Sequence, residues 1–132
     1  MTEADKSFAG KKVLIVEDDT FLHGLIANKM TELLEQGIEV FPVLDAKEAL
    51  KTAHEVHPDL LLLDIALPDK NGFTFLEELR KEDAFKTMPV IVLSNLDSDE
   101  DHTRAKELGV TSYLVKADFP LSEISKEILK HL

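Results

Sequence analysis

Residues 59–64 are Asp-Leu-Leu-Leu-Leu-Asp, an apolar run that is closed by an acid. A strand that is apolar at every position is typical of the centre of a parallel sheet, where helices cover both faces. We therefore predict a central strand at Leu60–Leu63. Asp64 follows this strand where a loop begins, so we expect its carboxylate at the carboxyl edge of the sheet, which is where such sheets bind ligands.

A second strand of the chain also ends in acids. The apolar stretch Lys12–Val16 is followed directly by Glu17, Asp18 and Asp19. If the two strands are parallel neighbours, three or four carboxylates meet at one edge, and such a group repels itself unless a cation lies in it. The pattern therefore predicts a cation site that draws on two separate parts of the chain.

The rest of the chain alternates apolar runs with amphipathic stretches, which indicates repeated strand–helix units. Further strands are expected at residues 38–43, 89–93 and 111–115, and Pro42 places the first of these at a sheet edge. Right-handed crossovers then favour a doubly wound α/β fold, a five-stranded parallel sheet of order 2-1-3-4-5 with flavodoxin-like topology. The expected helices are marked by apolar residues at helical spacing: Phe21, Leu22, Leu25, Ile26, Leu33, Leu34; Ala46, Ala49, Leu50, Ala53, Val56; Phe73, Phe75, Leu76, Leu79; a stretch after residues 97–101 that stops at Gly109; and Leu121, Ile124, Ile128, Leu132.

Composition limits the class of protein. The 132 residues suffice for one domain, which we place at residues 11–132 after a flexible lead at residues 1–10. A net charge of −11 argues against direct binding to nucleic acid or to an anionic membrane. No apolar run approaches the roughly 18 residues of a membrane span, and the chain has no cysteine. We therefore expect a soluble protein of the cytoplasm.

Four short motifs occur in order at the ends of the predicted strands. They are Val-Glu-Asp-Asp at 16–19, Leu-Leu-Asp-Ile-Ala-Leu-Pro at 62–68 with Gly72 after it, Val-Leu-Ser at 92–94, and Tyr-Leu-Val-Lys at 113–116. Through these motifs the chain resembles the CheY-like receiver domains of two-component response regulators. The resemblance runs from about Lys11 to Leu132.

The resemblance implies a phosphoacceptor and a metal site. Asp64 aligns with the aspartate that accepts a phosphoryl group, so it would attack phosphorus in line while its other oxygen holds a metal. Glu17 and Asp18 align with the family's acidic pair, and the backbone carbonyl of Ala66 would complete an oxygen site for Mg²⁺. Asp18 is expected to bind the ion directly and Glu17 through water. For Asp19 we favour a role as the N-cap of the first helix, with Thr20 as the alternative.

The resemblance also implies three residues that respond to the phosphoryl group. Lys116 would bind a phosphoryl oxygen or, at rest, the carboxylate of Asp64. Ser94 aligns with the hydroxyl residue that binds the phosphoryl group and draws its loop inward, and Tyr113 with the aromatic residue that then swings inward.

The chain departs from the family pattern at Ala117, at Ala66 and at Asn95-Leu96. Ala117 follows Lys116 where the family usually has proline, often after a cis bond, so we expect the loop after the last strand to differ. Ala66 and Asn95-Leu96 flank the phosphoryl site and are expected to alter the lifetime of the phosphoryl group.

The acidic run at residues 97–101 most simply complements the positive end of the following helix, and a partner-binding patch remains an alternative. The five histidines, His23, His54, His57, His102 and His131, have no ligand spacing and are expected at the surface.

The most specific interpretation is a stand-alone receiver rather than an enzyme. A histidine kinase or phosphotransfer protein would dock near the first helix and phosphorylate Asp64 with Mg²⁺. The change would reach a target protein through one face of the domain, formed by the helix after residues 97–101 (helix four), the strand at residues 111–115 (strand five) and the last helix (helix five). One alternative is a pseudo-receiver that binds partners without phosphate. Another is a haloacid-dehalogenase-type phosphatase, which should end its first strand in Asp-x-Asp and not in Glu17-Asp18-Asp19. Flavodoxin shares the sheet order, but its phosphate-binding loop and flavin-binding aromatic residues are missing here.

Overall fold

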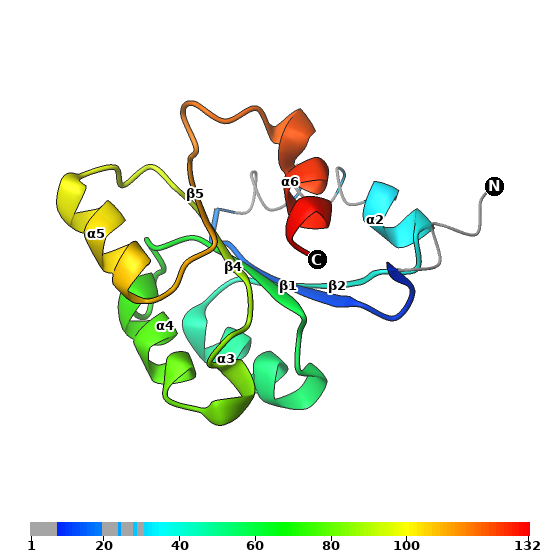
Figure 1. Cartoon of the computed structure of the whole chain (residues 1–132), viewed down its shortest axis with the longest axis horizontal. Helices are drawn as coiled ribbons and strands as arrows, with labels where there is room; N and C mark the ends of the chain where they lie inside the picture. The colour runs from blue at the N-terminus through cyan, green and yellow to red at the C-terminus, as the bar shows by residue number, and fades with distance from the viewer. Residues whose placement is uncertain (1–7, 20–23, 25–27, 29–30) are drawn as a thin grey trace.

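A parallel sheet with helices on both faces forms the framework of the computed structural model, which describes residues 8–19, 24, 28 and 31–132 (Figure 1). The sheet order is β2-β1-β3-β4-β5, as predicted. The strands are β1 (Lys12–Val16), β2 (Glu39–Val43), β3 (Leu60–Leu63), β4 (Val90–Ser94) and β5 (Ser112–Val115). The helices are α2 (Thr31–Glu35), α3 (Ala46–Val56), α4 (Gly72–Arg80), α5 (Asp99–Glu107) and α6 (Ile124–His131), with short 3₁₀ turns η2 (Asp83–Phe85) and η3 (Leu121–Glu123).

The register of the sheet brings the two acidic strand ends together. Val16 of β1 is paired with Leu63 of β3, so Glu17 and Asp64 are the next residues on adjacent strands. The amide of Asp64 continues the ladder by donating to the carbonyl of Val16 at 3.0 Å. β2 is one of the two edge strands, which agrees with the proline at position 42.

Two apolar clusters hold helices against the two faces of the sheet. On one face α3, α4 and α5 pack over alternate strand residues, and on the other face α2 and α6 do so (Figure 1). Every residue of β3 is buried, because helices cover both of its faces. The largest side chains of the first cluster are Phe73, Phe75 and Phe85, and the second cluster is built on Ile15, Leu33, Leu62, Ile124 and Ile128.

The structure refines several expectations. β4 extends one residue further than predicted and includes Ser94. Leu34 does not share the buried side of its helix with Leu33, because it is 55% exposed. Leu121 lies in η3, so the last helix begins only at Ile124. The helical positions predicted at 21, 22, 25 and 26 lie outside the described residues, and so does the choice between Asp19 and Thr20 as the cap.

Only part of the predicted N-terminal lead is described. Phe8 is partly buried and packs against the cluster under α2 and α6. The amide of Gly10 donates to the carbonyl of Gly37 at 3.0 Å, so residues 8–10 are attached to the domain at this point. The boundary at residue 11 stays a prediction.

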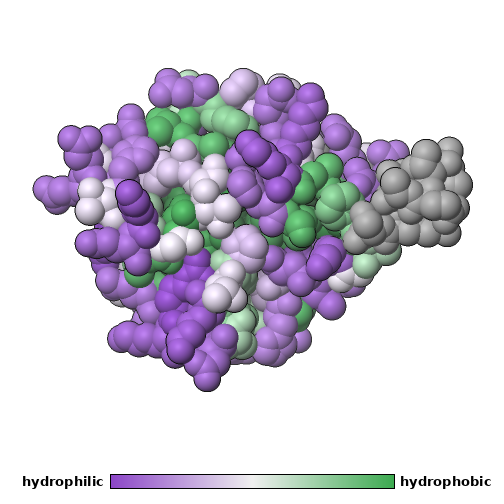
Figure 2. All heavy atoms as spheres, viewed as in Figure 1, coloured by the Kyte–Doolittle hydropathy of each residue, from purple (hydrophilic) through white to green (hydrophobic). Residues whose placement is uncertain are grey.

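Hydrophilic side chains cover most of the face shown in Figure 2, and hydrophobic ones appear in the gaps between them. Large apolar side chains that are exposed, among the residues described, are Leu34, Leu44 and Leu96. Within the same residues, no helix is long and apolar enough to cross a membrane.

Candidate functional site

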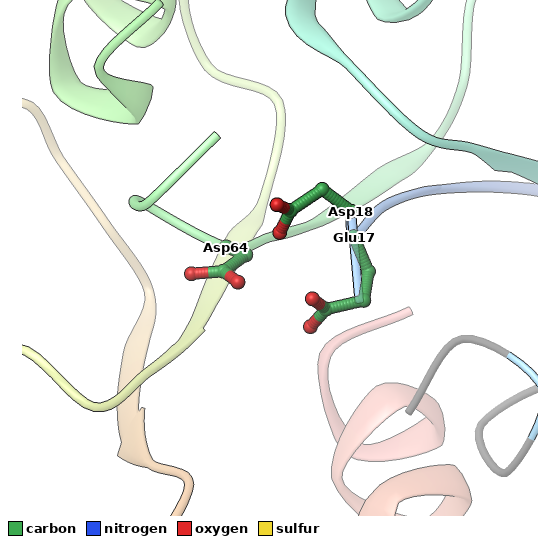
Figure 3. Close-up of side chains that lie close together, drawn as sticks. All are labelled: Glu17, Asp18 and Asp64. Atoms are coloured by element: carbon green, nitrogen blue, oxygen red, sulfur yellow. The ribbon is translucent and has the colours of Figure 1, made fainter. Parts of the chain in front are cut away.

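Three carboxylates converge at the carboxyl edge of the sheet (Figure 3). Glu17 and Asp18 follow β1, Asp64 follows β3, and one carboxylate oxygen of each lies within 4.8 Å of those of the other two. Glu17 is 2% exposed and Asp64 is 4% exposed, whereas Asp18 is more accessible. Two carboxylates in a water-poor environment require a positive partner, because burial of unpaired charge is costly.

Lys116 supplies that positive charge. It follows the last residue of β5, and its Nζ lies 2.7 Å from Oδ2 of Asp64 and 2.9 Å from Oε1 of Glu17. The backbone amide of Lys116 donates to the carbonyl of Ser94 at 2.9 Å, which fixes the strand end from which the side chain extends. The ammonium group therefore bridges two buried carboxylates that come from different strands.

Burial and the contacts between these groups shift the pKa values of Glu17 and Lys116. Burial, opposed by the hydrogen bond from Lys116 and assisted by the charge of Asp64, raises the pKa of Glu17 to about 7. For Lys116, burial by itself lowers the pKa, but the hydrogen bonds to Asp64 and Glu17 outweigh it and leave the pKa raised. Two buried carboxylates thus share a single ammonium group.

The donor set suits a hard divalent cation. All of the side-chain donors are carboxylate oxygens, the ligands that Mg²⁺ prefers, and Asp18 leaves an accessible side where water could complete the coordination. One oxygen of Asp64 accepts from the amide of Ala66 at 3.0 Å and the other from Lys116. The residues present thus fit a magnesium ion, and Glu17, Asp18 and Asp64 are those that would hold it.

The loop after Asp64 is held in place by backbone contacts. The amide of Gly72 donates to the carbonyl of Ile65 at 2.7 Å, and a Cβ at position 72 would lie 2.6 Å from Cα of Ile65. Only glycine permits this approach. Asp69 accepts from the amides of Ala46 and Lys47, both at 3.0 Å, and so attaches the loop to the start of α3.

Ser94 and Tyr113 both contact Leu96, in the loop between β4 and α5. Ser94 is fully buried, and its Oγ accepts from the amide of Leu96 at 3.2 Å. The hydroxyl of Tyr113 donates to the carbonyl of Leu96. Burial, with the charges of Asp101, Asp97 and Asp64, raises the pKa of Tyr113 to about 12.

The residue after Lys116 makes a contact that proline could not make. The amide of Ala117 donates to Oδ1 of Asn95 at 3.1 Å, which joins the loop after β5 to the loop after β4. No cis peptide bond occurs in the described part of the chain. Two of the positions that depart from the family pattern, 95 and 117, are therefore hydrogen-bonded to each other.

The geometry unites most of the residues selected from sequence. Glu17, Asp18, Asp64 and Lys116 form one cluster, whereas Ser94 and Tyr113 are joined to each other through Leu96. The carbonyl of Ala66 as a metal ligand stays a prediction. Sequence reasoning missed Asp69, and it placed Asn95 beside the phosphoryl site without its contact to Ala117. Each of these side chains binds a backbone amide that is 22 or more positions away, and no local pattern marks such a pairing. Asp99, Glu100 and Asp101 occupy the first turn of α5 as expected, and Ser98 with Asp101 forms its capping box.

Comparison with known proteins agrees with these features. A family model described as response regulator receiver domain matches residues 13–129. The transcriptional regulatory protein CiaR of Streptococcus pneumoniae is 38% identical over 117 residues, which are 89% of this chain and 49% of that protein. BasR of Escherichia coli is 37% identical over 118 residues, 89% of this chain and 50% of that protein. The chain thus spans about half the length of these relatives.

Solved structures show the same fold. The chemotaxis protein CheY4 of Vibrio cholerae, crystallised at low pH, superposes with a TM-score of 0.81 at 29% identity, over 94% of this chain and all of that one (100%). The BeF₃-activated receiver domain of RstA from Klebsiella pneumoniae gives a TM-score of 0.76 at 31% identity, over 92% of this chain and 97% of that one.

Proposed function

This chain belongs to the family of response regulator receiver domains, and on that premise we propose that it accepts a phosphoryl group on Asp64 from a phosphohistidine of a histidine kinase or phosphotransfer protein. One observation supports the proposal above all. One carboxylate oxygen each of Glu17, Asp18 and Asp64 lies within 4.8 Å of the other two. The carboxylate of Asp64 is also 2.7 Å from the Nζ of Lys116.

The reaction is a transfer between two side chains. An oxygen of Asp64 attacks phosphorus, an O–P bond forms, the N–P bond to the imidazole of the donor breaks, and the departing imidazole keeps the electron pair and takes up a proton. Lys116 is placed to neutralise an oxygen of the incoming group once Asp64 is esterified. The domain is a phosphoacceptor and not an enzyme that turns over a separate substrate.

The metal-binding residues determine where the charge of the phosphoryl group is balanced. A magnesium ion held by Glu17, Asp18, Asp64 and the carbonyl of Ala66 would supply positive charge that stabilises the transferring group. The carboxylates of Glu17 and Asp18 would hold the ion beside Asp64. Burial, together with the charge of Asp64, raises the pKa of Glu17 to about 7, and a bound cation would favour the ionised form of this side chain.

The response to phosphorylation is proposed to pass through Ser94 and Tyr113. In the structure the amide of Leu96 donates to Oγ of Ser94 at 3.2 Å. This hydrogen bond would break when Ser94 turns to bind the phosphoryl group. As Ser94 draws this loop inward, Tyr113, whose hydroxyl donates to the carbonyl of Leu96, would swing inward with it. The change would then reach the surface formed by α5, β5 and α6, where a protein target binds.

Partners and context follow as proposals. The donor protein is expected to dock near residues 20–30, most of which lie outside the described part of the chain. Direct contact with nucleic acid is not expected of this domain, because its net charge is −11. CiaR and BasR are transcriptional regulators about twice as long as this chain, so the stand-alone organisation and the cytoplasmic location stay predictions.

Phosphorylation with a small donor tests the proposal. The protein is incubated with acetyl phosphate and Mg²⁺ and its intact mass is measured. An acid-stable gain of one phosphoryl group that Asp64→Asn abolishes supports the proposal. The matched control is Asp59→Asn at the opposite end of β3, where the carboxylate accepts from the amide of Lys12 at 2.8 Å. This variant should still be phosphorylated.

The opposite result has a defined meaning. If the wild-type protein gains no phosphoryl group although it is folded, the proposal is wrong and the chain is a pseudo-receiver. A pull-down that compares wild type with Asp64→Ala, each with and without acetyl phosphate, then asks whether partner binding depends on this residue.

A further inference from the structure

Asp69 joins two segments that flank the carboxylate cluster. Its Oδ1 accepts from the amide of Ala46 and its Oδ2 from the amide of Lys47, both at 3.0 Å, and these hydrogen bonds lower the pKa of Asp69. Asp69 lies in the loop after β3, whereas the two amides belong to the first turn of α3, which follows β2. Because β1 lies between β2 and β3 in the sheet, this contact connects the segments on the two sides of β1, whose end is followed by Glu17 and Asp18.

The start of α3 already has a cap of its own. Asp45 is the N-cap residue, and its side chain accepts from the amide of Glu48 at 2.8 Å. Capping by a residue of the same segment is the ordinary arrangement at a helix start. Asp69 comes from another element and binds two further amides of the same turn. We therefore look for the effect of Asp69 in the loop that carries it.

That loop connects the position of Asp69 to the carboxylate of Asp64. Ala66 is paired with Asn71 in an antiparallel bridge, so the two arms of the loop lie beside each other. Only two residues separate Ala66 from Asp69, and one of them is Pro68, in which the ring fixes a backbone angle. The amide of Ala66 donates to Oδ1 of Asp64 at 3.0 Å. A shift of Asp69 is therefore expected to move the backbone of Ala66 and the carboxylate that it orients.

The opposite end of the contact is attached to the strand that precedes the other acids. The amide of Glu17 donates at 3.1 Å to the carbonyl of Val43, the last residue of β2, and α3 begins three residues later. The amide of Asp64 donates at 3.0 Å to the last carbonyl of β1. Asp69 thus closes a ring of contacts that includes Glu17 and Asp64, and Asp18 follows Glu17 directly (Figure 3).

We propose that Asp69 is a positioning residue for the metal site. It holds the loop after β3, with the carbonyl of Ala66, at a fixed place relative to the acids after β1. Mg²⁺ demands a near-ideal octahedron of oxygens, whereas Ca²⁺ accepts a more flexible set. The contact therefore favours Mg²⁺ over Ca²⁺. The inference rests on the proposed function in that Glu17, Asp18 and Asp64 are taken as ligands of the ion.

Binding of the two cations measures this positioning. Mg²⁺ and Ca²⁺ are each titrated by calorimetry into the wild-type protein, Asp69→Ala and Asp69→Asn. Loss of a residue that orients metal ligands weakens metal binding by roughly 10- to 100-fold. Because Asp69 acts through the backbone of Ala66, we expect the lower limit, a loss of about tenfold for Mg²⁺ in Asp69→Ala, and a smaller loss for Ca²⁺. Asp69→Asn keeps one acceptor oxygen and should lie between wild type and Asp69→Ala.

Asp45→Ala is the matched control. It also removes one negative charge and one cap from the start of α3, but its carboxylate binds Glu48 of its own helix. A mere loss of charge weakens both cations alike, and exposed charges are largely screened by salt. We therefore expect the Mg²⁺ affinity of Asp45→Ala to stay within about twofold of that of the wild type.

A second measurement needs no metal. Hydrogen exchange of the Ala66 amide is followed by NMR in metal-free protein. In Asp69→Ala it should accelerate by about two- to tenfold, the factor that corresponds to loss of one hydrogen bond, because the loop no longer holds this amide on Asp64. In Asp45→Ala it should match the wild type.

Several results would overturn the role of Asp69. They are an unchanged Mg²⁺ affinity in Asp69→Ala, an equal loss for Mg²⁺ and Ca²⁺, an equal loss in Asp45→Ala, unchanged exchange at Ala66, and a wild-type protein that binds neither ion.

Phosphorylation by acetyl phosphate separates this inference from the proposed function. The initial rate in Asp69→Ala should fall at limiting Mg²⁺ and return close to the wild-type rate at saturating Mg²⁺, since the change lies in metal affinity. If the wild type binds Mg²⁺ but gains no phosphoryl group, the proposed function fails, whereas the two affinities still decide the role of Asp69. If the wild type is phosphorylated and Asp69→Ala binds both cations as the wild type does, the inference fails and the proposed function stands.

Discussion

Replacement of Lys116 by methionine tests the electrostatic account of the site most directly. Methionine has a similar length and no charge, so the substitution removes the ammonium group that lies 2.7 Å from Asp64 and 2.9 Å from Glu17. Both carboxylates remain where they are, at 4% and 2% exposure. The variant therefore isolates the cost of leaving two buried negative charges beside each other.

The magnitude follows from burial. Removal of one partner of a buried ion pair costs about 3–5 kcal/mol of unfolding free energy, because the remaining charge is left uncompensated. We expect a loss in this range at about pH 8, where Glu17 of the wild type, with its pKa of about 7, is ionised beside the ammonium group. Without Lys116 the pKa of Glu17 rises further, and the proton that Glu17 then takes up is part of the cost. At about pH 6 a proton on Glu17 removes part of the repulsion, so the loss should be roughly half as large.

Urea unfolding with and without magnesium is the assay. Magnesium should stabilise Lys116→Met more than wild type, because the cation can take the place of the missing ammonium group; a ligand at about 100 times its Kd adds about 2.7 kcal/mol. Lys70→Met is the matched control. The Nζ of Lys70 lies 2.7 Å from Glu78, but both side chains are exposed, at 38% and 47%, so its loss should cost about 1 kcal/mol or less.

Two results would refute this reasoning. One is a cost of Lys116→Met no greater than that of Lys70→Met, which would mean that the buried carboxylates do not depend on the ammonium group. The other is an equal gain from magnesium in Lys116→Met and in wild type, which would mean that the cation does not bind among these carboxylates.

Three further predictions concern the framework and the switch. Gly72→Ala should destabilise the protein by about 1–3 kcal/mol in urea unfolding, because the new methyl would overlap the backbone of Ile65. Arg80→Met should cost about 2–4 kcal/mol in the same assay, since the guanidinium donates to five backbone carbonyls near the ends of α5 and η2. Tyr113 is the one tyrosine of the chain, so the tyrosinate absorbance should appear near pH 12 and not near 10.0. Because the pKa of this acid is raised in the folded state, its contribution to stability is complete below its ordinary pKa and is lost as the pH rises through 12.

Each of these predictions can fail in a distinct way. An unaltered urea midpoint for Gly72→Ala would show that the loop after Asp64 can shift without cost. If Arg80→Met is as stable as the wild type, the carbonyls that this residue binds must be satisfied by water. A tyrosinate transition near the ordinary value, measured while the fold is intact by circular dichroism, would contradict the burial of Tyr113.

The sequence was sufficient for the fold because its signals are local and repeated. Leu60–Leu63 is apolar at every position and is buried at every position, since a strand covered on both faces has no side that can be polar. Pro42 predicted that its strand lies at an edge, because proline has no backbone N–H to donate to a sheet ladder. Leu34 shows the limit of such reasoning, since one turn of helix admits two neighbouring apolar residues of which only Leu33 reaches the core.

The acidic part of the site was also predictable. Glu17, Asp18 and Asp64 follow two apolar strands directly, and parallel strands leave their carboxyl ends at one edge. Lys116 could be assigned through the family resemblance, but its distances to two carboxylates could not, because they depend on how β5 packs beside β4 and on the bend of a long side chain.

The sequence by itself determined the order of the strands and the acids at their ends. Whether a strand is buried, and where it ends, depends on residues that are contiguous in the chain. The tertiary structure alone decided the contacts between loops: Asp69 with the start of α3, Asn95 with Ala117, and His102 with Tyr113. These pairs join residues that are distant in the chain, or that lie on separate elements, and their side chains have several rotamers in isolation. Only the packing of helices on the sheet selects the rotamers that meet.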